Sequence, residues 1–334
     1  MKKLEIYGTL GPSCCHKEII RKMFELGMNG MRLNLSHCNL WDKKEWIDAF
    51  HQAKDELGIQ ADLLIDMRGP ELRVSHIDED INVEEGKEIE LSIPVIPNRV
   101  LESIEINDKV LLDDGKIKLL VKEISARSFK AEVLRGGKLK NNKSIAITGK
   151  SIEGDVLTPS DILNLKEAKK YGVTGIMQPF VNSAKALMEV KNTLKTLNAD
   201  DLKVYAKIEN SHGFHHLTEL FDYCDCIVIA RGDLGNAYGL PVLPAMQHRI
   251  EHTCHQYHFP YMVVTEMLYS MQEKAVPTRA EVSDIFHAVY QGASSIMLTG
   301  ETASGKYPVE AMKYFTQTAS LALKEREIDF VIND

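Results

Sequence analysis

Short apolar runs alternate with longer segments of helical spacing along most of the chain. The apolar runs, which are typical of buried strands, are Leu4–Tyr7, Gly30–Leu35, Ala61–Ile65, Gly175–Met177, Val204–Ala206, Cys226–Ala230, Tyr261–Val264 and Ser295–Leu298. Between most of them, apolar residues recur every three or four positions, as in Ile19, Met23 and Leu26. A chain in which buried strands and amphipathic helices alternate predicts a parallel sheet that is covered by helices.

Glycines mark the ends of several predicted helices just before the next strand. They are Gly27, Gly58, Gly172 and Gly292, and glycine ends a helix in a left-handed turn with little steric strain. Eight strands, most of them separated by one helix, predict a TIM (β/α)8 barrel. An open doubly wound sheet is the alternative arrangement for such a chain.

One stretch, from Val74 to about Leu157, shows no helical stripe. Strand and turn signals dominate it, and Lys109–Leu112, Asp113-Asp114-Gly115 and Lys116–Val121 together predict a β-hairpin. An insertion after the third barrel strand lies at the catalytic mouth, so we expect a small all-β lid domain there. The predicted domains are a barrel of residues 1–73 and 158–334 and a lid of residues 74–157.

Composition and charge narrow the class of protein. The 334 residues are 44% hydrophobic and 26% charged, with a net charge of −8. This predicts a globular chain that binds no nucleic acid, since nucleic-acid binders usually carry a basic face. No apolar run is long enough to cross a membrane, and the N-terminus shows no signal-peptide core. We therefore expect a cytoplasmic protein, with homo-oligomerisation left open.

Polar and charged residues follow most of the predicted barrel strands. They are Arg32, Asn34, Ser36 and His37 after the second strand, Asp66, Arg68, Glu71 and Arg73 after the third, Lys207, Glu209 and Asn210 after the fifth, Arg231–Gly235 after the sixth, Thr265 and Glu266 after the seventh, and Thr299–Thr302 after the eighth. The carboxyl ends of barrel strands meet at one face, where TIM-barrel enzymes place their active sites. The pattern predicts a charged catalytic mouth.

Two carboxylates and a lysine indicate the chemistry of this mouth. Glu209 and Asp233 follow adjacent strands and are suitable oxygen ligands for Mg²⁺ or Mn²⁺. Lys207 and Glu209 are two residues apart, so their side chains point to the same side of the strand. A lysine beside a metal carboxylate can stabilise the charge on a transferring phosphoryl group or on an enolate.

Two arginines and a glycine-containing turn predict an anionic substrate. Arg32 and Arg73 can each make bidentate contacts to phosphate. The segment Arg231–Gly235 leaves backbone N–H groups free to bind a carboxylate.

Motifs at these positions resemble those of the pyruvate kinase family. They are Gly8-Thr9-Leu10-Gly11-Pro12-Ser13, Arg32-Leu33-Asn34-Leu35-Ser36-His37, Asp66-Met67-Arg68-Gly69-Pro70-Glu71-Leu72-Arg73, Ala206-Lys207-Ile208-Glu209-Asn210, Ala230-Arg231-Gly232-Asp233-Leu234-Gly235, Pro277-Thr278-Arg279-Ala280-Glu281 and Gly300-Glu301-Thr302-Ala303. The resemblance runs from about Tyr7 to Leu323, in the family's order, and the Asp113-Asp114-Gly115 hairpin resembles the family's lid.

The resemblance implies a role for each matching position. Lys207 would stabilise the phosphoryl transition state, Glu209 and Asp233 would hold Mg²⁺, and Arg32, Gly232, Asp233 and Thr265 would bind phosphoenolpyruvate or pyruvate. Thr265 would lie where enolpyruvate gains its proton. Arg73, Asn34 and His37 would contact ADP or ATP, and Asn34, Ser36, Asp66 and the Met67 carbonyl would bind K⁺. Glu71 accords with K⁺ dependence, since the K⁺-independent branch tends to carry lysine there.

Two departures from the family pattern affect the nucleotide. Ser160 stands where the family has lysine, and Asn182 stands where it has arginine. Both changes remove positive charge, so we expect weak ADP binding unless Lys166 or Lys169 reaches back to replace the lysine. The family's C-terminal effector domain has no counterpart after about Lys324, so we expect no activation by sugar phosphates.

The resemblance favours phosphoryl transfer from phosphoenolpyruvate to ADP, with Mg²⁺ or Mn²⁺ and K⁺ as cofactors. One alternative is a metal-dependent lyase or aldolase that stabilises an enolate without nucleotide. Another is a non-catalytic relative, which the intact Lys207, Glu209, Asp233 and Thr265 disfavour.

Overall fold

The barrel predicted from the alternating pattern is present in the computed structural model, which describes residues 4–150 and 154–333. Eight parallel strands close in the order β1-β15-β14-β13-β12-β11-β3-β2. Their bounds are Glu5–Leu10 (β1), Gly30–Asn34 (β2), Asp62–Asp66 (β3), Gly175–Gln178 (β11), Lys203–Ile208 (β12), Cys226–Ala230 (β13), Tyr261–Val264 (β14) and Ser295–Met297 (β15). The prediction of a closed barrel is confirmed, and the open-sheet alternative is wrong.

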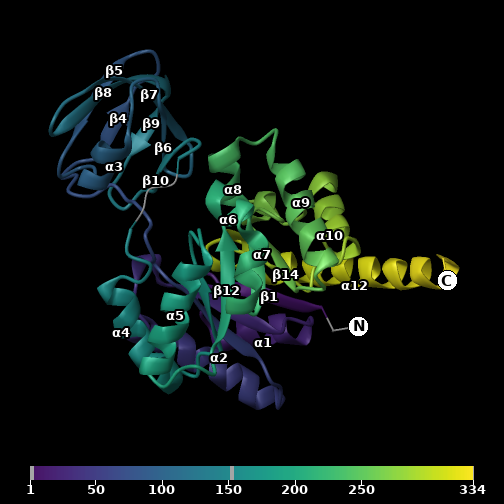
Figure 1. Cartoon of the computed structure of the whole chain (residues 1–334). Coiled ribbons are helices and arrows are strands. Elements are labelled where there is room, and N and C mark those ends of the chain that lie inside the picture. Colours follow the sequence, from purple (N-terminus) through teal and green to yellow (C-terminus); the bar gives the residue numbers. More distant parts are fainter. Residues whose placement is uncertain (1–3, 151–153, 334) are drawn as a thin grey trace.

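Helices surround the barrel and fill most connections between its strands (Figure 1). They are Lys17–Glu25 (α1), Lys44–Leu57 (α2), Pro159–Glu167 (α4), Ala184–Thr196 (α5), Ser211–His215 (α6), Leu217–Leu220 (α7), Arg231–Tyr238 (α8), Leu243–Gln256 (α9), Arg279–Tyr290 (α10), Gly300–Ala303 (α11) and Pro308–Asn333 (α12). Short 3-10 helices span Leu35–His37 (η1), Trp41–Lys43 (η2), Ala168–Tyr171 (η3), Phe221–Tyr223 (η4) and Tyr269–Gln272 (η5). In the described residues, no helix is both long enough and apolar enough to cross a bilayer.

Two layers of apolar side chains hold the barrel together. Inside it, alternate strand residues such as Tyr7, Leu64, Met177 and Met262 form a buried cluster. Their neighbours along each strand face outwards and pack against the helices in a larger cluster. This division follows from the two-residue period of a strand and explains why the strands read as continuous apolar runs.

The insertion after β3 forms a separate unit at one end of the barrel (Figure 1). A five-stranded antiparallel sheet has the order β10-β6-β7-β8-β5, and β4 pairs with β9. The bounds are Ile81–Val83 (β4), Glu88–Ser92 (β5), Lys109–Leu112 (β6), Ile117–Ile124 (β7), Ser128–Arg135 (β8), Gly137–Leu139 (β9) and Ile145–Ile147 (β10). The predicted hairpin is confirmed, because β6 and β7 pair directly through the turn at Asp113-Asp114-Gly115.

The lid is not purely β structure. A six-residue helix, Asn98–Ser103 (α3), follows Pro97 and buries Val100 and Leu101. Proline before a helix supplies an extended residue without a backbone donor, and six residues are too few to show an amphipathic stripe. The lid has an apolar core of its own, which includes Leu72, whereas Leu157 belongs to the barrel core.

Candidate active site

A cleft of about 1770 Å³ lies between the lid and the carboxyl ends of the barrel strands. Residues after β2, β3, β12, β13, β14 and β15 line its barrel side, and residues around the β6–β7 hairpin and Asn141–Ser144 line its lid side. Strand ends that are far apart in the sequence thus meet around one space, as the polar pattern predicted.

An ammonium group held between two carboxylates lies in this cleft. Lys207 Nζ is 2.9 Å from Glu209 Oε1 and 3.3 Å from Asp66 Oδ1. The second oxygen of Asp66, Oδ2, lies 3.0 Å from Arg32 Nε and forms an ion pair with it. The geometry does not allow a hydrogen bond from the Nε–H group of Arg32 to this oxygen. The side chains of Lys207, Asp66 and Glu209 are 15% exposed or less. The structure therefore brings together four of the predicted residues in a shielded cluster.

The surroundings of Lys207 fix its charge. Burial acts to lower the pKa of Lys207, but the opposite charges of Asp66 and Glu209 outweigh it, and the pKa is raised above its ordinary value. Lys207 therefore stays an ammonium group throughout the ordinary pH range. A permanent cation at the mouth of the barrel can attract and stabilise an anionic group.

The negative charge of Glu209 acts on the neighbouring carboxylate of Asp233. Glu209 Oε2 accepts a hydrogen bond of 2.7 Å from the backbone N–H of Phe180. Burial, together with the negative charges of Glu209 and Glu71, raises the pKa of Asp233 to about 8. Excess negative charge on hard oxygen atoms fits a divalent cation such as Mg²⁺, which would favour the ionised form of Asp233.

Thr265 lies directly after β14 in a strained backbone conformation. Its φ is +79°, which a β-branched residue rarely adopts. Arg231 holds this backbone by donating from Nη2 and Nε to the Thr265 carbonyl, at 2.7 and 3.1 Å. Asp284 on α10 in turn accepts two bonds of 2.8 Å from Arg231 Nη1. The sequence interpretation missed both Arg231 and Asp284 as positioning residues, because their contacts span separate strands and helices.

Gly232, after β13, and Thr265, after β14, lie side by side. A Cβ atom at Gly232 would lie 3.3 Å from Thr265 Cγ2, so glycine leaves room beside the threonine methyl group. Gly232 and Asp233 lie in the first turn of α8, where backbone N–H groups have no partner within the helix. Gly232 and Thr265, two of the residues predicted to bind substrate, therefore lie together beside these N–H groups.

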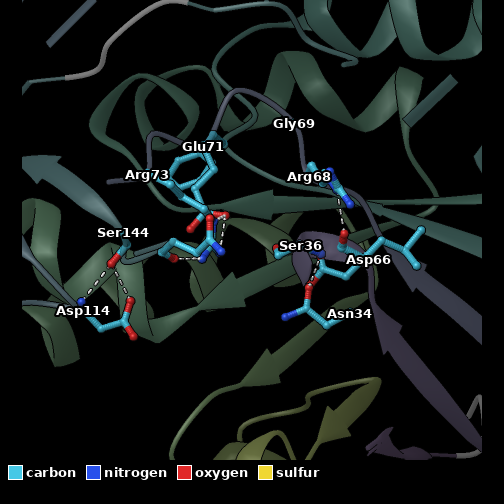
Figure 2. A network of polar contacts seen from close by, with 12 residues as sticks. Asn34, Ser36, Asp66, Arg68, Gly69, Glu71, Arg73, Asp114 and Ser144 are labelled. Atoms are coloured by element: carbon cyan, nitrogen blue, oxygen red, sulfur yellow. Dashed lines mark hydrogen bonds and ion pairs between the residues drawn. The ribbon is translucent and has the colours of Figure 1, made fainter. Parts of the chain in front are cut away.

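The residues predicted to bind K⁺ lie at the ends of β2 and β3 (Figure 2). Asn34 and Asp66 are register partners in these parallel strands, so their side chains emerge at the same edge. Asn34 precedes η1 as its N-cap, and its Oδ1 accepts a 3.1 Å hydrogen bond from the backbone N–H of Ser36 in η1. Oxygen atoms from amide, hydroxyl and carboxylate groups fit a hard monovalent cation. His37 belongs to η1, but its side chain falls outside the described part of the structure.

Arg73 lies where the chain enters the lid, and much of its guanidinium group is already in use. It donates to Glu71 Oε2 from Nη2 and Nε, at 2.7 and 3.0 Å, and to the Asn142 carbonyl from Nη1 (Figure 2). Burial raises the pKa of Glu71, while the neighbouring Arg73 opposes that rise. Arg73 lines the cleft as predicted, with only part of its donor capacity left for a ligand.

Asp161, at the start of α4, fixes the loop that leaves β3. Its carboxylate accepts from the backbone N–H groups of Arg68 and Gly69, at 2.8 and 3.0 Å, and forms a capping box with Thr158. Gly69 has a φ of +56°, and a Cβ atom there would lie 2.6 Å from Pro179 Cγ. The sequence interpretation used Asp161 only to locate the missing lysine and did not foresee this role.

The two departures from the family pattern leave neutral groups in their places. Ser160 Oγ donates to Asn39 Oδ1 at 2.8 Å, and Asn182 Oδ1 accepts from Ser183 Oγ at 2.9 Å. Lys169 forms an ion pair of 2.8 Å with Asp201, which precedes β12 at the opposite end of the barrel. The idea that Lys169 reaches back to the cleft is therefore wrong.

Comparison with known proteins agrees with this geometry. A family model described as the pyruvate kinase barrel domain matches residues 1–312. A pyruvate kinase of Aeropyrum pernix is 34% identical over 96% of this chain and 71% of its own length. One of Borreliella burgdorferi is 34% identical over 98% of this chain and 70% of its own. One of Sporosarcina psychrophila is 33% identical, and the match covers only 57% of that relative's length.

The closed barrel, its charged mouth and these matches together define the class. The chain belongs to the pyruvate kinase family and is a phosphotransferase built on a TIM barrel.

Proposed function

We propose that this chain transfers the phosphoryl group of phosphoenolpyruvate to ADP, giving pyruvate and ATP. One observation carries the proposal: the Lys207 ammonium group is held 2.9 Å from Glu209 and 3.3 Å from Asp66 at the mouth of the barrel. Membership of the pyruvate kinase family supports it. A fixed positive charge in a shielded cleft stabilises the charge on a phosphoryl group during its transfer.

Arg32, Gly232 and Thr265 would bind and orient phosphoenolpyruvate. Arg32 shares Asp66 with Lys207, so its guanidinium group is fixed beside the ammonium group. The N-terminus of α8 would bind the substrate carboxylate through free N–H groups. Thr265, held by Arg231, would lie beside the carbon atom that gains a proton.

Glu209 and Asp233 would hold Mg²⁺ or Mn²⁺, and Asn34, Ser36, Asp66 and the Met67 carbonyl would hold K⁺. The divalent ion would supply charge neutralisation for phosphate oxygen atoms. Arg73, together with Asn34 and His37, would bind the nucleotide. Weak affinity for ADP is expected from the neutral Ser160 and Asn182, since a charge-assisted contact contributes roughly 1.5–3 kcal/mol.

The test is the rate of pyruvate formation by the variant Lys207→Met, measured with and without ADP. Loss of the ammonium group should lower the rate by on the order of 10²–10³ or more. Lys203→Met is the matched control, because Lys203 lies at the other end of β12 and pairs with Asp62 at the barrel surface. A Lys207→Met rate within threefold of wild type would refute the assignment.

Omission of ADP separates the second candidate function from the first. Ser160 and Asn182 carry no positive charge that would bind nucleotide phosphate. Their neutrality favours a lyase or aldolase that stabilises an enolate without nucleotide. Pyruvate formation that is unchanged without ADP would support that reaction instead of phosphoryl transfer.

A further inference from the structure

Two cations lie directly opposite each other on the lid sheet. Lys118 on β7 and Arg135 on β8 are register partners, and both line the cleft. Like charges opposed on an antiparallel pair of strands destabilise the sheet. A negative charge, either from the protein or from a ligand, would relieve this repulsion.

A β-bulge creates this opposition. Leu119 pairs with Val133, whereas the preceding Lys118 pairs with Arg135, so Leu134 is the extra residue. In a regular ladder Lys118 would instead face Leu134. Leu119 is buried in the lid core, so the preceding Lys118 lies on the opposite face of the sheet, and Arg135 shares that face as its register partner. Bulges near active sites often redirect a side chain, which is what this one does to Arg135.

The other lysines on these two strands have carboxylate partners. Lys122 lies 2.8 Å from Glu132, and Lys130 lies 2.9 Å from Glu123. Within residues 4–150 and 154–333, no carboxylate lies within ion-pair distance of Lys118 or Arg135. The nearby Asp113 on the hairpin is occupied by Lys143 at 2.8 Å and Lys116 at 3.5 Å.

The unpaired cations line the same cleft as the candidate metal ligands. Gly115, at the tip of the same hairpin, packs against α8, since a Cβ atom there would lie 2.8 Å from Asn236 Oδ1. Asn236 lies about one helical turn after Asp233. Lys118 follows Gly115 by three residues, a distance of at most about 10 Å along a strand. An anion whose one end lies near Asp233 could therefore extend towards Lys118.

We propose that Lys118 and Arg135 bind the diphosphate group of the nucleotide from the lid side of the cleft. The proposal rests on the proposed function, because it assigns a position to the same nucleotide. Arg73 is partly occupied by Glu71 and Asn142, and Ser160 and Asn182 carry no charge. Lys118 and Arg135 supply cationic contacts to a diphosphate on the lid side of the cleft, and the bound anion relieves the repulsion between the two side chains.

Calorimetric titration of the full chain with ADP, inorganic pyrophosphate and adenosine in Mg²⁺ buffer tests this site. Lys118→Gln and Arg135→Gln should each weaken ADP and pyrophosphate binding about tenfold, as expected for the loss of one charge-assisted contact. Any binding of adenosine should be unaltered, because adenosine lacks the diphosphate. Lys122→Gln is the matched control on the same sheet and should bind ADP as wild type does.

Thermal unfolding distinguishes ligand binding from a structural role. The Gln variants should melt at or above the wild-type temperature, because one like-charge contact has been removed. Lys118→Arg should retain ADP affinity, since it keeps the charge.

Three outcomes would overturn the proposal: ADP affinity within twofold of wild type in both Gln variants, no binding of ADP or pyrophosphate by wild type, or Gln variants that unfold at a clearly lower temperature. Weaker ADP binding by the variants of a protein that forms no pyruvate would support this site and refute the proposed reaction. A wild type that forms pyruvate, together with Gln variants of unchanged ADP affinity, would support the proposed reaction and refute this site.

Discussion

Charge balance among a few side chains sets the properties of the candidate site. Asp66 is neutralised by Arg32 and Lys207, and Glu209 shares Lys207. Asp233 has no comparable cationic partner in the described residues, and burial together with neighbouring carboxylates raises its pKa. The residues therefore leave a local deficit of positive charge, which a divalent cation would correct.

Removal of either candidate metal ligand should weaken metal binding. Glu209→Gln and Asp233→Asn each replace an anionic oxygen ligand by a neutral one, and we expect at least about tenfold weaker Mn²⁺ affinity, since hard cations prefer carboxylates. Calorimetric titration with Mn²⁺ at constant pH measures the effect. Glu266→Gln is the control, because Glu266 lines the same cleft without being a proposed ligand. Unchanged affinity in both test variants would place the ion elsewhere.

At the scale of elements, the parallel pairing of β2 and β3 brings the candidate K⁺ ligands together. Asn34 and Asp66 are partners in this pairing. Adjacent strands lie about 4.8 Å apart, so two side chains at the same register can share one ion. The loop after β3 is held in turn by Asp161 on α4.

The rate of pyruvate formation should therefore be higher in K⁺ than in Na⁺ at constant ionic strength. The oxygen set at the ends of β2 and β3 would order around the larger ion and fix Asp66 beside Lys207. Ser36→Ala should weaken the response to K⁺, whereas Ser304→Ala, at an exposed hydroxyl group after α11, should not. Equal rates of the wild type in the two salts would count against a K⁺ site here.

At the scale of the whole molecule, the lid reaches the barrel through the tip of its β6–β7 hairpin. Gly115 lies against Asn236 of α8, the helix that begins with the candidate substrate-binding residues. Its φ of +78° is also one that glycine adopts with little strain. Backbone conformation thus favours glycine here, and a larger residue would have to displace the Asn236 side chain.

Gly115→Ala should lower kcat/KM several-fold, because the added methyl group would displace the Asn236 side chain that joins α8 to the tip of the hairpin. Gly149→Ala is a matched control: Gly149 lies in the same lid insertion with the same φ of +78°, but a Cβ atom there meets nothing within 4 Å. Both variants should lose similar stability, about 1 kcal/mol, from the left-handed conformation alone. Steady-state kinetics and thermal unfolding measure the two effects. Equal kinetic losses in the two variants would contradict a specific role for the contact with Asn236.

The sequence by itself determined the elements, because strand and helix periods depend on neighbours along the chain. The ranges Cys226–Ala230 and Tyr261–Val264 agree with β13 and β14, and the other barrel strands differ from prediction only near their ends. The lid hairpin followed from its local turn residues. The six-residue α3 escaped prediction, since it spans less than two helical turns and carries no repeated stripe.

The tertiary structure alone decided the partners of the charged residues. Lys207 and Asp66 are 141 residues apart, and no local pattern encodes their contact. The strain at Thr265 and the Arg231–Asp284 pair likewise depend on packing between separate elements. The Lys118–Arg135 opposition depends on a bulge, whose position the buried Leu119 and Val133 fix within the lid core. Periodicity is a property of neighbouring residues, whereas charge pairing, strain and register arise when distant segments must share one space.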